Sequence, residues 1–273
     1  MLHNKLTPLL RQYLEVKEEY RDCLIFFRLG DFYELFFEDA QLASKCLDIT
    51  LTKRGQVDGN DIPMCGVPHH HGDNYIAKLL KKGFKVAICE QIETPDESKK
   101  RGQKEIIKRK VVRVATPGTL TEEKELLTSD NNYLMSILSF NDYFNIVIID
   151  ISTGELSLKK YIFEKEVLNY IDDIMPSEII IPKNKKYNFI LANRKKSLMI
   201  TILEEELIKF DSAKHSLLES YAANNNFKIL NFSKNDIISL GTTINYVSYT
   251  QNGKLPALSI PNNKENNDYL EID

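Results

Sequence analysis

The stretch Cys23-Leu24-Ile25-Phe26-Phe27, interrupted by Gly30-Asp31 and followed by Phe32-Tyr33-Glu34-Leu35-Phe36, decides the fold of the first part of this 273-residue chain. A short continuous apolar run such as Cys23–Phe27 is typical of a buried strand. Gly30-Asp31 is a turn signal. In extended structure residues two apart share a face, so Phe32 and Glu34 are expected to point the same way.

The elements around this stretch are short and mixed in type. Thr7 can cap a first helix with Pro8 at its first position, and apolar residues then recur at helical spacing. The pattern further predicts two helices, one with Ala40, Ala43, Cys46 and Leu47 on one face and one over 73–82. It predicts strands over 49–52, 84–92 and 106–114. Polar loops are predicted over 56–61 and 95–102. These elements predict a small mixed α/β domain over residues 1–115.

A different pattern begins after the breaker cluster Ala115-Thr116-Pro117-Gly118-Thr119 and a polar linker, predicted over 116–131. Three strands are predicted in a meander, followed by a helix, two more strands and two helices; their ranges are 133–140, 144–151, 155–162, 167–174, 178–181, 198–203, 211–223 and 235–250. Three antiparallel strands followed by alternating helices and strands predict an RNase H-like sheet with helical cover, over 132–255. Residues 256–273 are expected to begin a following region.

Composition places the chain among globular proteins, with 42% hydrophobic and 27% charged residues. No apolar run approaches the ~20 residues that a membrane span requires, and the first residues lack the features of a signal peptide. The four cysteines are scattered without a C-x-x-C pair. We therefore expect a reduced, cytoplasmic protein without a membrane partner.

The charge is distributed unevenly along the chain. Residues 1–115 hold 20 Lys and Arg against 17 Asp and Glu, a net charge of +3, whereas residues 116–273 hold 16 against 22, a net charge of −6. The two halves are therefore expected to have different partners.

Several common catalytic and cofactor motifs are absent from the sequence. It contains no G-x-x-x-x-G-K-[ST], G-x-G-x-x-G, H-E-x-x-H or G-x-S-x-G. His69-His70-His71, with Cys65 and Asp73 nearby, invite a zinc interpretation, but three consecutive side chains do not converge on one tetrahedral ion from a regular backbone. The sequence therefore predicts neither a metal site nor a cofactor site in these residues.

Phe32 and Glu34 allow two interpretations. An aromatic side chain can wedge into a base step of DNA, and a carboxylate beside it can accept a hydrogen bond from a base edge or share a proton with one. Alternatively, an aromatic-rich strand is simply part of a core. A carboxylate is otherwise a poor DNA contact because phosphates repel it.

Basic residues form a second candidate feature. Eight Lys and Arg lie between Lys99 and Arg113, against the single acid Glu105, and Lys53-Arg54 adds a pair in a turn. Such clusters suit sequence-independent contacts to phosphates, and they are equally compatible with a solvated strand face. The residues expected at the DNA backbone are Lys53, Arg54, Lys99, Lys100, Arg101 and Lys104.

Taken together, these motifs resemble the N-terminal part of the MutS family of DNA mismatch-recognition proteins. The segments that carry the resemblance are Thr7–Leu9, Phe27–Phe36, Leu51–Gly55, Ile62–His70, Val86–Gln91, Val111–Thr119 and, for the family's connector domain, the weaker Asp150–Glu155. Two positions depart from the family pattern: Cys65 replaces the usual Ala, and His69 the usual Tyr. Neither belongs to the Phe-x-Glu motif that Phe32-Tyr33-Glu34 matches.

The resemblance implies a mismatch-binding domain, a connector domain and the first residues of the lever region. It further implies that Phe32 stacks on a mispaired base, that Glu34 hydrogen-bonds to it, and that Lys53-Arg54 lies near the DNA backbone. Family members continue into lever, clamp and ATPase domains, so ATP and magnesium binding, homodimerisation and ATP hydrolysis are expected only of a full-length protein. The connector is expected to contact MutL. These 273 residues by themselves are not expected to be an enzyme.

A metal-dependent nuclease is the alternative from another class. It would use Asp150 on the central strand of the RNase H-like sheet, with Glu155, Asp172 and Asp173 as the nearest further carboxylates. Convergence of these groups on shared ions would favour it. The Phe32-Tyr33-Glu34 motif favours mismatch binding, and a docking role of the acidic half would add to that function.

Overall fold

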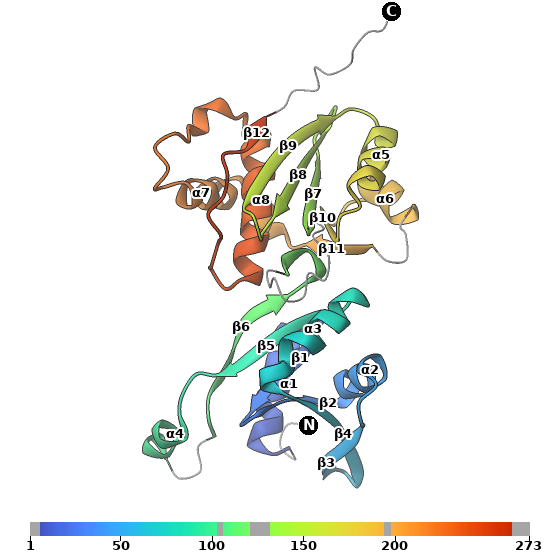
Figure 1. The fold of residues 1–273 in the computed structure, drawn as a ribbon, viewed down its shortest axis with the longest axis vertical. Helices are drawn as coiled ribbons and strands as arrows, with labels where there is room; N and C mark the ends of the chain where they lie inside the picture. The colour runs from blue at the N-terminus through green and yellow to red at the C-terminus, as the bar shows by residue number, and fades with distance from the viewer. Residues whose placement is uncertain (1–5, 103–105, 121–131, 194–197, 264–273) are drawn as a thin grey trace, which may run out of the picture. The chain divides into compact units, whose positions relative to one another are not determined.

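The computed structural model describes residues 6–102, 106–120, 132–193 and 198–263, which fall into two compact units, Met1–Thr116 and Pro117–Asp273 (Figure 1). The predicted linker segment 121–131 and Lys104 lie outside the described residues. Both units are mixed α/β, as the sequence predicts. The domain boundaries drawn from the sequence remain predictions.

Unit 1 is built on a six-stranded sheet with the order β3-β4-β2-β1-β5-β6. Its strands are β1 (Cys23–Leu29), β2 (Phe32–Phe36), β3 (Thr52–Val57), β4 (Asn60–Pro68), β5 (Lys85–Gln91) and β6 (Arg109–Ala115). Strands β1 and β5 pair in parallel, and the other neighbouring pairs are antiparallel. The helices are α1 (Pro8–Glu19), α2 (Phe37–Leu47), α3 (Gly72–Lys81) and α4 (Pro95–Arg101).

Helix α1 begins where the sequence predicts. The Thr7 hydroxyl accepts a hydrogen bond from the backbone N–H of Leu10, and Pro8 stands at the first helical position. Tyr13 is buried against Phe27 and Phe36 with edge-to-face geometry, at centroid distances of 5.5 and 5.0 Å. Helix α1 therefore covers one face of the β1–β2 pair.

A buried carboxylate ties α1 to α2 and β1. Asp39 accepts hydrogen bonds from the Tyr13 hydroxyl at 2.8 Å, from the Lys17 ammonium at 2.9 Å and from the Ile25 amide at 3.0 Å. Burial, followed by the nearby Asp39 charge, raises the pKa of Tyr13 well above its usual value, so the phenol remains a donor. The buried charge of Asp39 is thus paired with the partly exposed Lys17 ammonium and hydrogen-bonded by two further donors.

Two polar segments predicted as loops are regular structure. Residues 56–61 form the end of a two-stranded hairpin, in which β3 and β4 turn through Asp58 and Gly59, both with positive φ. Residues 95–102 contain helix α4, which carries a capping box: the Thr94 hydroxyl accepts from the Glu97 amide, and the Glu97 carboxylate accepts from the Thr94 amide. Both predictions were wrong because polarity indicates exposure to solvent and does not exclude a strand or a helix.

Unit 2 carries the sheet order β11-β10-β7-β8-β9-β12. Its strands are β7 (Tyr133–Ser139), β8 (Phe144–Asp150), β9 (Glu155–Tyr161), β10 (Glu178–Pro182), β11 (Met199–Leu203) and β12 (Asn262–Asn263). β7, β8 and β9 form an antiparallel meander, and β10 and β11 continue the sheet in parallel from β7. This is the RNase H-like arrangement that the sequence predicts.

Helices cover both faces of this sheet. On one face α7 (Phe210–Ser220) and α8 (Lys234–Thr250) pack with buried residues such as Leu217, Leu240 and Ile244, and on the other α5 (Glu164–Ile174) and α6 (Asn188–Ala192) pack with Val167 and Ile190. The α7–α8 contact requires a glycine, because a Cβ at Gly241 would lie 2.1 Å from the carbonyl oxygen of Ala213.

The first and last described segments of unit 2 are attached to its sheet. Glu178 is fully buried and accepts hydrogen bonds from the Gly118 amide at 3.1 Å and from the Thr201 and Tyr246 hydroxyls at 2.6 Å. Near the other end, the Ser259 amide donates to the Gly154 carbonyl at 2.8 Å, and β12 pairs with β9. No helix among the described residues is long and apolar enough to cross a membrane.

Candidate nucleic-acid interface

Strand β2 presents Phe32 at its exposed end. Phe32 stands opposite Leu29 of β1 and Pro68 of β4, directly after the tight turn at Gly30, where φ is +58°. Its side chain lies on the same face as Phe36, yet Phe36 is fully buried beneath α1 whereas Phe32 is 48% exposed. An aromatic side chain at the end of a core strand is therefore available to a ligand.

The opposite face of β2 anchors the strand. Tyr33 is buried, and its hydroxyl donates a hydrogen bond to Glu90 of β5. The Tyr33 ring packs directly on Gly72, where a Cβ would lie 2.7 Å from a ring carbon. Arg28 stands over the same ring at 5.7 Å. Because Glu90 holds the Tyr33 hydroxyl and Gly72 and Arg28 contact its ring, the backbone that carries Phe32 and Glu34 is held in place.

Glu34 lies next to Phe32 on the shared face, and its carboxylate is held by a cation. Both carboxylate oxygens accept hydrogen bonds from Nη1 of Arg54, at 2.6 and 2.5 Å. The Glu34 side chain is 13% exposed and that of Arg54 47% exposed. In the sheet, Glu34 stands opposite Phe27 of β1 and Gly66 of β4.

A second arginine, Arg109, interacts electrostatically with this carboxylate while its guanidinium is hydrogen-bonded to other groups. Arg109 of β6 donates to the carbonyls of Arg28 and Ile107 and to the side chain of Gln12, at 2.6 to 3.0 Å. Burial lowers the pKa of the Arg109 guanidinium, and the Cys89 thiol and the Glu34 carboxylate oppose that shift. Arg54, through an ion pair, and Arg109, through its charge, thus both interact with Glu34.

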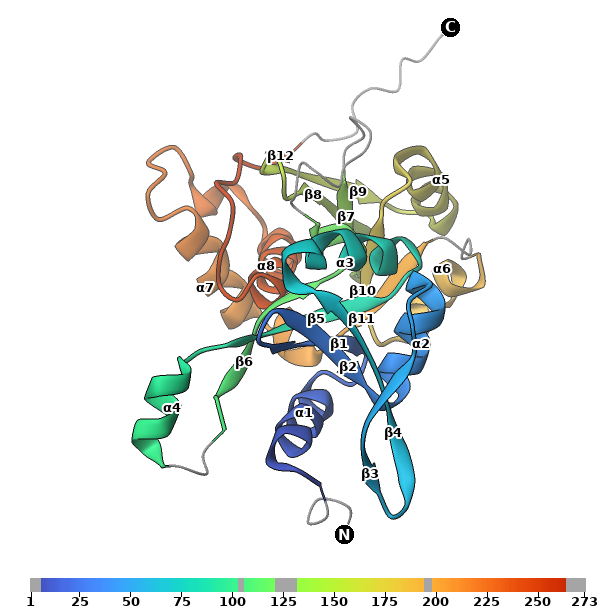
Figure 2. The same ribbon diagram turned by 60° about the horizontal axis from the view of Figure 1, so that its bottom comes forward.

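The predicted backbone contacts lie on two projections of unit 1. The first is the β3–β4 hairpin, at one edge of the sheet, and the second is the arm between β5 and β6 that carries α4, at the other edge (Figure 2). On the hairpin, Lys53 is 66% exposed and pairs with Asp61 at 2.7 Å. Hydrogen bonds from Lys53 and Gln56 lower the pKa of the Asp61 carboxyl.

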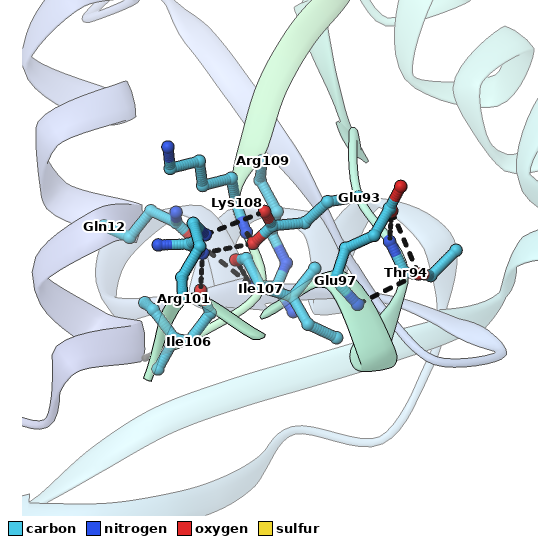
Figure 3. A network of polar contacts seen from close by, with 9 residues as sticks. All are labelled: Gln12, Glu93, Thr94, Glu97, Arg101, Ile106, Ile107, Lys108 and Arg109. Carbon is cyan, nitrogen blue, oxygen red and sulfur yellow. Dashed lines mark hydrogen bonds and ion pairs between the residues drawn. The ribbon is translucent and has the colours of Figure 1, made fainter. Parts of the chain in front are cut away.

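The α4 arm is held by Glu93, as Figure 3 shows. The Glu93 carboxylate accepts hydrogen bonds from the Arg101 guanidinium and, at 2.6 Å, from the Lys108 amide. Arg101 also donates to the Ile106 carbonyl at 2.9 Å. The Arg101 hydrogen bond is the largest cause of a lowered Glu93 pKa. Arg101 therefore stabilises the base of the arm through Glu93, whereas the sequence predicted it as a contact to the DNA backbone.

Among the described residues, further lysines of the arm and of the start of β6 face solvent. The Lys99 side chain is 75% exposed and lies 3.5 Å from Asp96, and Lys100, Lys108 and Lys110 are exposed. Sequence reasoning named Lys99 and Lys100 and missed Glu93. The only signal in the sequence is the group of acids, Glu93, Asp96 and Glu97, that precedes a strongly basic segment, and it does not single out Glu93.

The carboxylates of the nuclease alternative do not form a metal site. Asp150 is 1% exposed, and its Oδ1 accepts hydrogen bonds from the amide and hydroxyl of Ser152 at 2.9 and 2.6 Å. It therefore closes the turn between β8 and β9. Within the described residues no group of three or more His, Cys, Asp or Glu is placed to hold a metal ion. His69–His71 form a short 3-10 turn leading into α3.

Comparison with protein families assigns both units. MutS domain I matches residues 7–124 and MutS domain II matches residues 132–259, so that the two matches together span nearly all of the chain. The chain belongs to the MutS family. Phe32 and Glu34, with the hairpin and the α4 arm, lie in MutS domain I, and strands β7 to β11 of the RNase H-like sheet lie in MutS domain II.

Curated MutS relatives match across the whole chain. The DNA mismatch repair protein MutS of Wolbachia pipientis is 44% identical over 98% of this chain and 32% of the relative. Those of Roseobacter denitrificans and Anaplasma phagocytophilum are 40% and 39% identical, again over 98% of this chain, and over 30% and 32% of the relatives. The chain thus spans about a third of the length of the MutS proteins it matches.

Proposed function

We propose that this chain supplies the part of a mismatch-repair protein that recognises mispaired or unpaired bases in duplex DNA. The observation that carries the proposal is the exposure of Phe32 at the first position of a strand, within MutS domain I, whose other apolar residues Tyr33, Leu35 and Phe36 are buried. An aromatic ring exposed in this way can enter a base step.

The physical basis of recognition is the reduced cost of deforming DNA at a mismatch. Inserting an apolar side chain unstacks a step, at a cost of a few kcal/mol, and kinks the duplex. Bending a site by tens of degrees costs about 1–6 kcal/mol. Both costs fall where pairing and stacking are already weakened. Phe32 therefore selects mismatches without reading the surrounding sequence.

Glu34 adds a polar contact next to the wedge. An ionised carboxylate only accepts hydrogen bonds, so it suits an N–H group of a base whose own partner is lost. At a matched pair those N–H groups are occupied, and the carboxylate gains nothing. Glu34 therefore increases the difference in affinity between mismatched and matched DNA.

The exposed cations of the two projections supply sequence-independent affinity. Lys53 on the hairpin and Lys99 and Lys100 on α4 are solvent-facing and long enough to contact phosphates. Arg101 contributes by holding the arm through Glu93. These contacts keep the duplex in place while Phe32 tests it.

The wider activities of the family belong to this proposal as well. In a full-length protein we expect a homodimer, ATP and magnesium binding in a separate ATPase domain, and contact with MutL through unit 2, all in the cytoplasm. Unit 2 is acidic, with a net charge of −6 over residues 116–273, which suits a protein partner better than DNA.

The proposal is tested with the full-length gene product and duplexes that carry 2-aminopurine beside either a single mismatch or a matched pair. This base emits more strongly when it loses stacking. Binding is expected to raise emission at the mismatch and to leave the matched duplex nearly unchanged. Equal affinity and equal emission for the two duplexes would contradict the proposed function.

A further inference from the structure

The carboxylate of Glu34 is not free in the absence of DNA. Both of its oxygens are held by one nitrogen of Arg54, and both of these bonds are at or below 2.6 Å. Lys53, the neighbour of Arg54, pairs instead with Asp61 on its own hairpin. Two adjacent cations with the same predicted role thus have different partners.

The backbone of the hairpin directs Arg54 toward Glu34. The pairing of β3 with β4 shifts between Lys53 and Gln56, so that residues 54 and 55 stand where the partner strand has one residue. Gly55 has a φ of +78°, which a residue with a side chain adopts only under strain. A bulge of this kind redirects a side chain from the ordinary alternation of the strand.

The strand between the two partners leaves room for the contact. In the sheet order, β4 separates β3, which carries Arg54, from β2, which carries Glu34. The β4 residue paired with Glu34 is Gly66, and a Cβ there would contact the Cγ of Glu34 at 3.6 Å. Gly66 therefore places no side chain beside the Glu34 carboxylate, and a methyl group there would make only an ordinary van der Waals contact with it.

The ion pair changes what Glu34 can do at DNA. A bare carboxylate is repelled by every phosphate near the groove, whereas a paired carboxylate carries a compensating charge with it. An ionised carboxylate has about four lone-pair sites, and Arg54 occupies one on each oxygen, so sites remain for a base N–H. The pair can therefore persist while Glu34 accepts a hydrogen bond from DNA.

We propose that Arg54 is a positioning residue for Glu34: it holds the carboxylate on the Phe32 face of β2 and offsets its charge, so that the contribution of Glu34 to mismatch preference depends on Arg54. The inference rests on the proposed function and assigns Arg54 a role other than the phosphate contact expected from its sequence. A phosphate contact would strengthen binding to all DNA alike.

The test is a double-mutant cycle in the full-length gene product. Wild type, Arg54→Met, Glu34→Ala and the double variant are titrated against mismatched and matched duplexes, and the ratio of the two affinities is compared. Arg54→Met is expected to lower this ratio by about two- to tenfold, as coupled charged groups do. In the Glu34→Ala background the same change is expected to leave the ratio unaltered.

Lys53→Met provides the matched control, since it removes a neighbouring cation of the same hairpin that pairs with Asp61. It is expected to weaken binding to both duplexes equally, with or without Glu34. Two results would overturn the positioning role. In the first, Arg54→Met lowers the ratio of mismatched to matched affinity equally in the wild-type and Glu34→Ala backgrounds. In the second, Arg54→Met has the same effect on both affinities as Lys53→Met. A wild type that lacks any mismatch preference would instead contradict the proposed function itself.

A second measurement examines the ion pair without DNA. In the NMR spectrum of this chain, the guanidinium Nη protons of Arg54 are expected to exchange slowly with solvent and to give resolved signals. In the Glu34→Ala variant these signals are expected to disappear. If the Arg54 signals are the same in both proteins, the contact is not formed in solution and the inference fails.

Discussion

Replacing Phe32 by alanine separates recognition from stability. The ring is 48% exposed, so about half of the ~1.5–3 kcal/mol gained by burying a phenylalanine is at stake, or roughly 1 kcal/mol. In DNA binding the same ring is expected to contribute ~1–3 kcal/mol by stacking on a base, a factor of about 5 to 150. Phe32→Ala is therefore expected to abolish mismatch preference while the domain stays folded.

The assay compares affinities of the full-length gene product for mismatched and matched duplexes, together with thermal unfolding. Phe36→Ala is the contrasting variant, because Phe36 lies on the same face of β2 but is fully buried, and truncating a buried phenylalanine costs ~3–5 kcal/mol. Phe163→Ala, which removes a 65% exposed ring from unit 2, is the control for losing an exposed aromatic.

Two results would refute this reasoning. If Phe32→Ala leaves the ratio of mismatched to matched affinity unchanged, the ring does not enter the base step. If Phe32→Ala lowers the unfolding temperature as much as Phe36→Ala does, the ring belongs to the core and its exposure does not mark a binding site.

Three further predictions concern other parts of the chain. Glu34→Ala is expected to raise affinity for matched DNA and to steepen its salt dependence, because Arg54 loses the carboxylate that offsets its charge and is freed for a phosphate; a uniform loss of affinity for both duplexes would contradict this. This chain alone is expected to fold but to bind DNA weakly, with little mismatch preference and no ATP hydrolysis, and tight selective binding would show that unit 1 needs no further domains. Thr94→Ala is expected to destabilise α4 by ~1 kcal/mol, seen as faster hydrogen exchange over residues 95–101.

Local sequence signals predicted an element correctly where they agreed with the tertiary packing. Thr7 and Pro8 specify the start of α1 because a cap and a preset φ act within one helical turn. The meander of β7, β8 and β9 was predictable because β7 and β8 are apolar, β9 carries apolar residues at alternate positions, and turn residues separate each strand from the next. The order of these elements was enough to predict the RNase H-like sheet.

Polar segments were harder to predict. The end of the β3–β4 hairpin and helix α4 were predicted as loops, because an exposed ribbon and a short solvated helix have no apolar periodicity. Helix α4 was predictable in principle, since Thr94-Pro95-Asp96-Glu97 carries both a capping box and a proline at the first helical position. The Asp58-Gly59 turn is likewise a hairpin signal.

The sequence by itself determined the two-part organisation, both fold classes and the motif that contains Phe32 and Glu34, because these depend on neighbouring residues and on their spacing. Only the tertiary structure decided which members of that motif are exposed, since Phe32 and Phe36 differ through the position of α1. It also decided that Arg54 meets Glu34 and that Arg101 meets Glu93. Contacts between side chains on different strands depend on sheet order and on a bulge, which a linear sequence does not specify.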